Sequence, residues 1–410
     1  MSRTQLKRFL ALVCTLVILS SYYSLSPRVN NISSLPTFPT KYYDDIALKI
    51  DCKTSSFPGV SICLPSNEFE GKLSGTILFE SKMSHVDMVG FISGFQHTIG
   101  ASWDDPCAES TEDCGKKYVF TFQPPPVAGI YNLEILLLCN FNQNTSIYER
   151  RRRVIHDAPI KIMANISKSS TQLAPLSKNL SINEAFDELY IMKVRRIFFV
   201  GDSHMRKLYE HSIFLLCGKA LDLKVDDNVK FRHKSMILYY VKMEGIYDNG
   251  NFGCIGRGKF TGRTKFEVHG MDASDVVLVN DAHWTIAFCE KDKYAAYKHY
   301  LPKFLDFFSA KNQEKKVFIT SPPWNSLYSH NSCKRRTNIN LSWANHVGTS
   351  IALSKSWHIF DAWSLLIPLY NKTCDPAHFS CLVKKKNEKM IRGVDRDVVN
   401  KLWNYLTYAF

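Results

Sequence analysis

Residues 198–206, with the sequence FFVGDSHMR, contain a serine that could act as a nucleophile. Three apolar residues run into a glycine turn, and Asp202 and Ser203 follow immediately before a predicted helix. This turn would lift the Ser203 hydroxyl clear of a sheet and point the first N–H groups of the helix at a bound group. The alternative is structural, because aspartate and serine are also common helix caps.

Two later segments carry polar side chains that could complete such a site. Asn280 follows an apolar run, where its amide could donate a hydrogen bond to an oxyanion or could form an Asx turn that ends a strand. Asp375 and His378 lie three residues apart, so both side chains could reach one point. The alternative for this segment is a helix that starts with Asp375 as its cap and Pro376 as its first residue. Each segment alone fits a structural role, so their joint occurrence carries the argument.

The elements that would position these segments alternate between strands and helices from Val194 onward. Uniformly apolar runs separated by helices indicate a parallel sheet that is covered on both faces. We expect a helix from Ser203 and a closing amphipathic helix over residues 394–405. Chemistry in such sheets gathers at the carboxyl ends of the strands, where all three polar segments should lie. Four runs predict the strands: residues 194–200, 275–279, 317–320 and 357–360.

The region before residue 160 has the pattern of a smaller domain made of strands. Short β-branched or aromatic runs occur at residues 75–79 and 118–122, and residues 129–137 place apolar side chains on one face. These features predict a β-sandwich with disulfides. No pair of cysteines has the CxxC spacing of a zinc site. Five cysteines fall in this region: Cys52, Cys63, Cys107, Cys114 and Cys139.

The N-terminus predicts a membrane anchor. Basic residues precede residues 9–25, which carry no charge, and no good cleavage site follows them. The basic flank orients the rest of the chain toward the lumen, as a single-pass type II protein of the Golgi or secretory pathway, with a secreted protein as the alternative. We divide the chain into five parts: a signal-anchor (1–25), a stem (26–45), a β-sandwich (46–160), a linker (161–190) and an α/β domain (191–410).

Cysteines and glycosylation sequons support a lumenal location. An oxidising lumen would favour disulfides, and the eleven cysteines beyond the apolar run cannot all pair within one chain. We therefore expect one free thiol or intermolecular bridge. Six Asn-x-Ser/Thr sequons occur: Asn31, Asn144, Asn165, Asn179, Asn340 and Asn371.

The formal net charge of +14 suggests an acidic partner. A lumenal protein rarely meets nucleic acid, so anionic glycans or a membrane surface are the expected partners, and a solvated basic face is the alternative. The run Arg150–Arg153 has three interpretations: a convertase cleavage site, a polyanion-binding patch, or an exposed strand end without a role.

The segments VGDSHMR, DVVLVNDAHW and DPAH, in this order, resemble the PC-esterase branch of the SGNH hydrolase superfamily. That branch includes glycan O-acetyltransferases and proteins that join a neurexophilin-like β-sandwich to a PC-esterase domain. The resemblance covers residues 194–408, and for the first domain it is one of architecture only. It implies an α/β protein with an SGNH-like three-layer α/β/α parallel sheet, preceded by a small β-sandwich and an N-terminal transmembrane anchor.

The resemblance implies a role for each residue of the site. Ser203 resembles the nucleophile, His378 its general base, and Asp375 the residue that orients the base. Asn280 resembles an oxyanion donor beside the backbone N–H of Ser203. The oxyanion glycine of the superfamily has three candidates in this chain: Gly253, Gly256 and Gly258.

Other residues near these motifs are candidates for contacts with the substrate. Arg206 follows the nucleophile by one turn and could meet an anionic or polar group, or could simply face solvent. Trp284, Trp324 and Trp363 follow strands, where aromatic rings suit the apolar faces of sugars, although tryptophans are as common in cores.

Two further expectations concern the base. His204 and His283 are rivals of His378, but neither has an aspartate three residues before it. Cys374 and Cys381 bracket the loop that carries the base, so we expect at least one of them in a disulfide that supports it.

The resemblance implies a serine acyl-enzyme that transfers an acyl group, such as acetyl, to a glycan hydroxyl. No metal or bound cofactor is expected, and an acyl donor such as acetyl-CoA or an acyl ester would be the co-substrate. Two alternatives stay open: a glycan O-acetylesterase with the same residues, and a non-catalytic secreted binding or ligand protein that keeps the fold.

Overall fold

The structure is a computed structural model that describes parts of the chain between residues 50 and 410. The predicted signal-anchor and stem lie outside the described residues. Within the described ranges, no helix is long and apolar enough to cross a membrane. The described residues are 50–65, 69–70, 73–94, 98–108, 114–123, 128–142, 147–163, 180–218, 220–221, 229–242, 271–280, 282–288, 293–309, 315–328, 336–385, 388–393 and 395–410.

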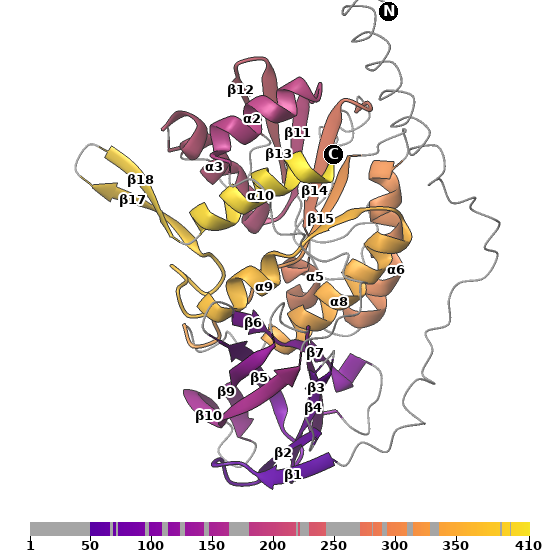
Figure 1. Cartoon of the computed structure of the whole chain (residues 1–410), viewed down its shortest axis with the longest axis vertical. Helices are drawn as coiled ribbons and strands as arrows, with labels where there is room; N and C mark the ends of the chain where they lie inside the picture. The colour runs from indigo at the N-terminus through magenta and orange to yellow at the C-terminus, as the bar shows by residue number, and fades with distance from the viewer. Residues whose placement is uncertain are drawn as a thin grey trace, which may run out of the picture. The chain divides into compact units, whose positions relative to one another are not determined.

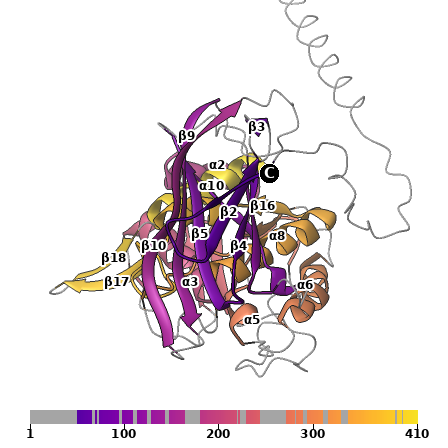
Figure 2. The same ribbon diagram turned by 90° about the horizontal axis from the view of Figure 1, so that it is seen from below.

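The first half of the chain forms two five-stranded sheets that pack face to face, as predicted for a β-sandwich (Figures 1 and 2). One sheet has the strand order β1-β2-β4-β8-β7, and the other has the order β3-β10-β9-β5-β6. Strand bounds are β1 Ile50–Thr54, β2 Val60–Pro65, β3 Phe69–Glu70, β4 Leu73–Phe79, β5 Ser84–Ser93, β6 Thr98–Gly100, β7 Ser102–Asp104, β8 Lys117–Phe122, β9 Gly129–Asn142 and β10 Ile147–Met163, with a short 3-10 helix η1 at Pro106–Ala108.

Strand β9 shows how this half is attached to the rest of the protein. Leu133, Ile135 and Leu137 lie in the core of the sandwich, as the alternation of the sequence predicts. Leu136 and Leu138 point to the opposite face and are buried in a second core that also contains helices of the other half. Because successive side chains of a strand face opposite ways, β9 joins the two cores.

Disulfides stabilise this half. Cys52 pairs with Cys63 and Cys107 pairs with Cys114, while Cys139 is also disulfide-bonded. Cys217 in the second half is a free thiol. The expectation that one cysteine stays unpaired is therefore met within the part of the chain that the structure describes.

The arginine run lies inside strand β10 rather than in a loop. Arg150 is in register with Cys139, and Arg153 with Leu137, across a β-bulge. Arg152 forms an ion pair with Glu134 of β9, with an N–O distance of 2.7 Å. A protease must bind its substrate as a free extended segment, so pairing of this strand argues against cleavage at the run in the folded protein.

Two of the six predicted glycosylation sites lie within the described residues. Asn371 is exposed in a turn. The Asn340 amide donates hydrogen bonds to Asp105 and Tyr294, and it is partly buried. A glycan on Asn340 would replace one of the two amide hydrogens and would therefore remove at least one of these bonds.

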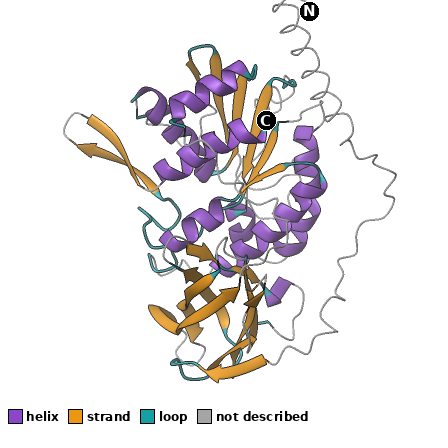
Figure 3. Cartoon of the chain, in the orientation of Figure 1, coloured by secondary structure: helices purple, strands orange, loops and turns teal. Residues whose placement is uncertain are grey.

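The second half contains a six-stranded sheet with the order β12-β13-β11-β14-β15-β16. Figure 3 shows strands of this half flanked by helices. All neighbours are parallel except β12, which is antiparallel to β13 at one edge. The strands are β11 Arg196–Gly201, β12 Val229–His233, β13 Met236–Lys242, β14 Asp275–Asn280, β15 Lys316–Ile319 and β16 His358–Phe360. A separate hairpin pairs β17 Ser380–Lys385 with β18 Glu388–Gly393.

Helices cover both faces of this sheet, which confirms a mixed α/β fold with a largely parallel sheet (Figure 1). In β11, Ile197 and Phe199 pack with α2, α3 and α10, whereas Phe198 and Val200 pack with α5, α6 and α8. The helices are α2 Ile182–Ile191, α3 Ser203–Cys217, α5 His283–Phe288, α6 Lys293–Ser309, α8 Asn338–Ser354, α9 Ala362–Leu366, η2 Ile367–Leu369 and α10 Asp395–Ala409. Helix α2 begins within the region expected as a linker, because a capping box at Ser181 starts it.

The strand order places a switch point between β11 and β14. When the five parallel strands are numbered by their order along the chain, they lie side by side in the order 2-1-3-4-5. The connections that follow the first and the third strand therefore run along opposite faces of the sheet. In open sheets of this kind, ligands bind beyond the carboxyl ends of the strands at the switch point. In this protein the two strands end side by side at Gly201 and Asn280.

Polar contacts from the sandwich reach buried groups of the second half. Asp87, at a bulge in β5, is fully buried and accepts hydrogen bonds from the backbone N–H and side-chain amide of Asn338 at the start of α8, at 2.5 and 3.0 Å. At Gly100 in β6, a Cβ atom would lie 1.7 Å from the side chain of Ile367. The two halves therefore pack directly against each other at both of these points.

Asp87 should make stability depend on pH. Burial raises its pKa to about 7, although the hydrogen bonds from Asn338 oppose that rise. Because the folded pKa lies above the unfolded value, the stabilisation from this group is complete below about pH 4 and is lost as the pH rises through about 7. We expect the Tm to fall between about pH 5 and about pH 8, and Asp87→Asn to flatten that fall. Asp51→Asn, at an exposed carboxylate, is the control, and an unchanged slope in Asp87→Asn would contradict the assignment.

Candidate active site

Ser203 stands where β11 turns directly into α3. Gly201 has a φ of 153°, and a Cβ atom there would lie 2.2 Å from the backbone oxygen of Asn280, so the turn requires glycine. Asp202 is the N-cap of α3, and its Oδ1 accepts a hydrogen bond from the backbone N–H of His204 at 2.8 Å. Since Asp202 caps the helix, the Ser203 hydroxyl is not needed for capping.

The loop between η2 and β17 brings two more predicted residues to Ser203. The Ser203 Oγ lies 2.7 Å from His378 Nε2, and His378 Nδ1 lies 2.7 Å from Asp375 Oδ2. The other oxygen of Asp375 accepts the backbone N–H groups of Ala377 and His378, each at 2.8 Å. A carboxylate at Nδ1 holds the proton there and leaves Nε2 able to accept the proton of Ser203.

Several contacts hold the loop that carries His378. Cys374 is disulfide-bonded, which confirms the expected disulfide of this loop, and its backbone N–H donates to the carbonyl of His378 at 2.7 Å. The backbone N–H of Asn325 donates to the carbonyl of Pro376 at 2.9 Å. Phe379 is buried among helices of the second half. A base on a loop needs such support to keep its geometry.

The electrostatics of Asp375 suit a carboxylate that orients a base. Burial alone would raise its pKa, but the hydrogen bond and charge of His378 and two backbone N–H groups lower the pKa to about 2. Asp375 therefore stays ionised throughout the range in which histidine titrates.

The two rival histidines lie next to the base but do not contact the nucleophile. The His204 ring stacks on His283, with centroids 4.1 Å apart, and lies 5.2 Å from the His378 ring. His283 is fully buried, and its Nε2 is bound to the carbonyl of Pro322 at 2.9 Å. Burial, followed by nearby positive charge, lowers the pKa of both rings well below its usual value. Both rings are therefore neutral, and they lie beside the ring of His378.

The amide of Asn280 does not have the orientation expected of an oxyanion donor. Its Nδ2 donates to the carbonyl of Ile319 at 2.8 Å and to the Ser321 hydroxyl at 3.1 Å. A carbonyl can only accept, so this contact fixes which end of the amide is the nitrogen. The Oδ1 atom is buried and has no hydrogen-bond partner in the described structure. In this arrangement both amide hydrogens of Asn280 are used, so neither is free to donate to an oxyanion.

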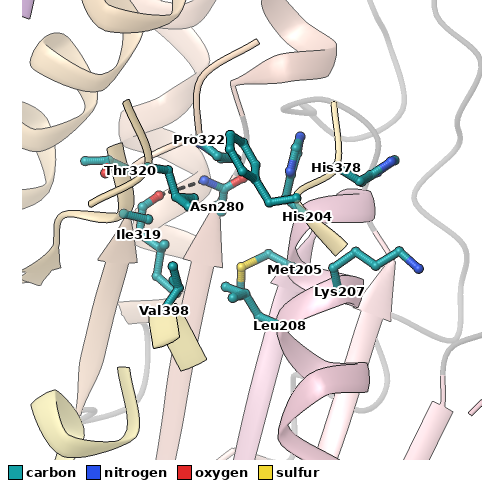
Figure 4. A pocket seen from close by; sticks show the side chains of 13 residues that line it. His204, Met205, Lys207, Leu208, Asn280, Ile319, Thr320, Pro322, His378 and Val398 are labelled. Atoms are coloured by element: carbon teal, nitrogen blue, oxygen red, sulfur yellow. Dashed lines mark hydrogen bonds between the residues drawn. The ribbon is translucent and has the colours of Figure 1, made fainter. Parts of the chain in front are cut away.

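A small cavity of about 20 Å³ opens beside the triad (Figure 4). A volume of this size holds a group about as large as one water molecule. His204, Lys207, Asn280, Thr320 and His378 are its polar lining residues. The apolar lining comes from Met205, Leu208, Ile319, Pro322, Ala362, Leu366, Phe379 and Val398.

Arg206 and Trp284 do not line this cavity, so the geometry gives no support to their predicted contacts with substrate. Arg206 turns along α3 toward Glu210, with an N–O distance of 3.6 Å. Trp284 is half-buried in α5. Arginine and tryptophan that follow a motif in sequence can point away from it, because a helix turns each residue by about 100°.

The other two tryptophans are buried, which fits the core alternative rather than contact with a sugar. Trp363 is buried, and its Nε1 donates to the carbonyl of Ala101 in the sandwich at 3.3 Å, so it belongs to the contact between the halves. Trp324 is buried, with its ring centroid 6.0 Å from that of His283, and the guanidinium of Arg336 lies over the Trp324 ring. Besides burial, the charge of Arg336 contributes to the lowered pKa of His204 and His283, and neither spacing nor strand pattern in the sequence marks this residue.

The predicted oxyanion glycines at 253, 256 and 258 lie outside the described residues. Among the residues that the structure does describe, no group of three or more His, Cys, Asp or Glu side chains could hold a metal ion. Comparison of the chain with protein-family models, curated proteins and solved structures finds no match.

Substitutions at the three joined residues should separate their roles. We expect Ser203→Ala and His378→Ala to lower the hydrolysis of an activated ester by about 10⁴-fold or more, and Asp375→Asn to lower it less, because Asp375 orients and does not react. His283→Ala is the matched control and should keep most of the activity. If His378→Ala stayed active while His283→Ala did not, the assignment of the base would be wrong.

Proposed function

We propose that this protein is an SGNH-type serine acyltransferase that moves an acyl group, such as acetyl, to a glycan hydroxyl. The chain of two 2.7 Å hydrogen bonds from Ser203 through His378 to Asp375 carries the proposal. Helix caps and Asx turns explain each segment alone, but they give no reason for the three side chains to meet. These side chains also lie beside the switch point of the sheet, where ligands bind in open sheets, and this position supports a ligand site.

The first half-reaction forms an acyl-enzyme. His378 Nε2 takes the proton of Ser203, and the freed Oγ attacks the carbonyl carbon of the acyl donor. The backbone N–H of Ser203, at the start of α3, stabilises the negative oxygen of the tetrahedral intermediate. As that intermediate collapses, the bond to the leaving group breaks, and the leaving group receives the proton from His378.

The second half-reaction runs the same steps with a different oxygen. A hydroxyl of the acceptor gives its proton to His378 Nε2 and attacks the acyl carbon. The ester bond to Ser203 then breaks, and Ser203 regains a proton from His378. Throughout, Asp375 stays ionised and holds the imidazole in the tautomer that accepts at Nε2.

The substrate class and the location are proposed from the whole chain. Disulfides in both halves favour an oxidising compartment, and the exposed Asn371 sequon is available there. An N-terminal anchor and stem resemble those of enzymes that modify glycans in the Golgi lumen. The excess of positive charge favours an anionic glycan or a membrane surface nearby. Acetyl-CoA or an acyl ester would supply the acyl group.

A serine-directed probe tests whether the site is an enzyme at all. A fluorophosphonate should label the full-length wild-type protein on Ser203, because a hydrogen-bonded base activates that hydroxyl. Ser203→Ala should not be labelled, and Met205→Leu, a volume-conserving change in the cavity wall, is the matched control. Absence of labelling in the folded wild type would favour the binding or ligand protein instead.

A second experiment separates transfer from hydrolysis. An activated acyl ester is supplied with and without candidate glycans, and mass spectrometry follows both acyl-glycan and free acid. We expect acyl-glycan that depends on Ser203, because a transferase holds its acceptor and limits the access of water. Free acid released at one rate whatever glycan is present would identify an esterase.

A further inference from the structure

Two buried polar atoms without hydrogen-bond partners belong to residues that line the cavity beside Ser203. They are His204 Nε2 and Asn280 Oδ1. His204 is 7% exposed and Asn280 is 1% exposed, so bulk water does not satisfy them. A buried polar atom without a partner costs about 1–3 kcal/mol, which makes such a pair a sign of a bound group.

The chemistry of the two atoms restricts what can bind between them. Asn280 Oδ1 only accepts hydrogen bonds, because the amide nitrogen is fixed on the carbonyl of Ile319. Figure 4 shows this nitrogen turned toward Ile319 and the side chain of His204 on the other side of Asn280. The ring of His204 is neutral, so its Nε2 can donate or accept according to its tautomer. A hydroxyl satisfies both atoms, whereas an oxyanion would face the lone pairs of Oδ1.

This hydroxyl cannot be the one that reacts. The reacting hydroxyl must give its only proton to His378, and a proton shared with Asn280 Oδ1 is not available for that transfer. The His204 and His378 rings lie side by side, with centroids 5.2 Å apart. A hydroxyl on the carbon next to the reacting one would therefore reach His204 while its neighbour reaches His378.

We infer that the cavity binds a second, non-reacting hydroxyl of the acyl acceptor, between His204 Nε2 and Asn280 Oδ1, and that the acceptors are therefore vicinal diols of sugars. This inference rests on the proposed function and names the acceptor class for the same site. It gives Asn280 the role of an acceptor for a hydroxyl rather than that of an oxyanion donor. His204 becomes a residue that contacts the substrate and sets acceptor preference.

The test compares two acceptors of similar shape, trans-1,2-cyclohexanediol and cyclohexanol, with p-nitrophenyl acetate as the acyl donor and the full-length protein. The wild type should acetylate the diol with a higher kcat/KM than the monool. His204→Phe keeps a ring in the stack but removes Nε2. It should lower the ratio of kcat/KM for the diol to kcat/KM for the monool by about 3- to 10-fold, the value of one neutral hydrogen bond. His204→Gln should restore part of the preference, and Asp51→Asn, at an exposed carboxylate of the sandwich, is the control that should behave as the wild type.

The burst of p-nitrophenol reports acyl-enzyme formation and separates the possible failures. It is measured in the wild type and in both variants, so that a change in acyl-enzyme formation is separated from a change in acceptor preference, and it should fall less than 10-fold in Asn280→Ala. A fall of about 10² to 10³ in Asn280→Ala would identify Asn280 as an oxyanion donor and overturn the inference. Equal wild-type rates for the two acceptors, or equal losses in His204→Phe, would overturn the inference and leave the proposed function standing. No burst and no probe labelling in the wild type would refute both.

Discussion

The hydrogen bond between Ser203 Oγ and His378 Nε2 is the contact on which the site depends, and it joins residues 175 positions apart. Ser203 is placed by regular structure, because a strand, a glycine turn and a capped helix leave it little freedom. His378 lies on a loop, which lacks the regular backbone hydrogen bonds that hold a helix or a strand. Much of the surrounding structure compensates for that asymmetry, through the disulfide at Cys374, the contact with Asn325 and the burial of Phe379.

The β-sandwich contributes to that support. The segment that leads into the loop includes α9 and η2, and both pack against the sandwich through Trp363 and Ile367. Gly100 approaches Ile367 so closely that a methyl group would not fit. Asp87 satisfies the first N–H of α8. The second half is therefore not an independent body, and the sandwich forms part of the scaffold of the site.

Burial decides which titratable groups around Ser203 carry a charge. Asp375 is half-exposed and hydrogen-bonded, so it stays ionised, whereas His204 and His283 are buried and stay neutral. Of the three neighbouring imidazoles, only that of His378 has a carboxylate to stabilise a positive charge. Environment, rather than residue type, thus singles out the base.

The sequence alone determined four of the five parallel strands of the second half, the start of α3 at Ser203 and the pairing of Asp375 with His378, but it did not mark β12, β13 or the β17–β18 hairpin. These are local features, since hydrophobic period, capping preference and three-residue spacing act within one turn or strand. The sheet order and the joint core of the two halves required the folded chain, as did the different roles of Trp363, Arg206 and Asn280. Such roles depend on where a side chain points and what it meets from distant segments. The orientation of the Asn280 amide, for example, is decided by the carbonyl of Ile319, which lies 39 residues away in the chain.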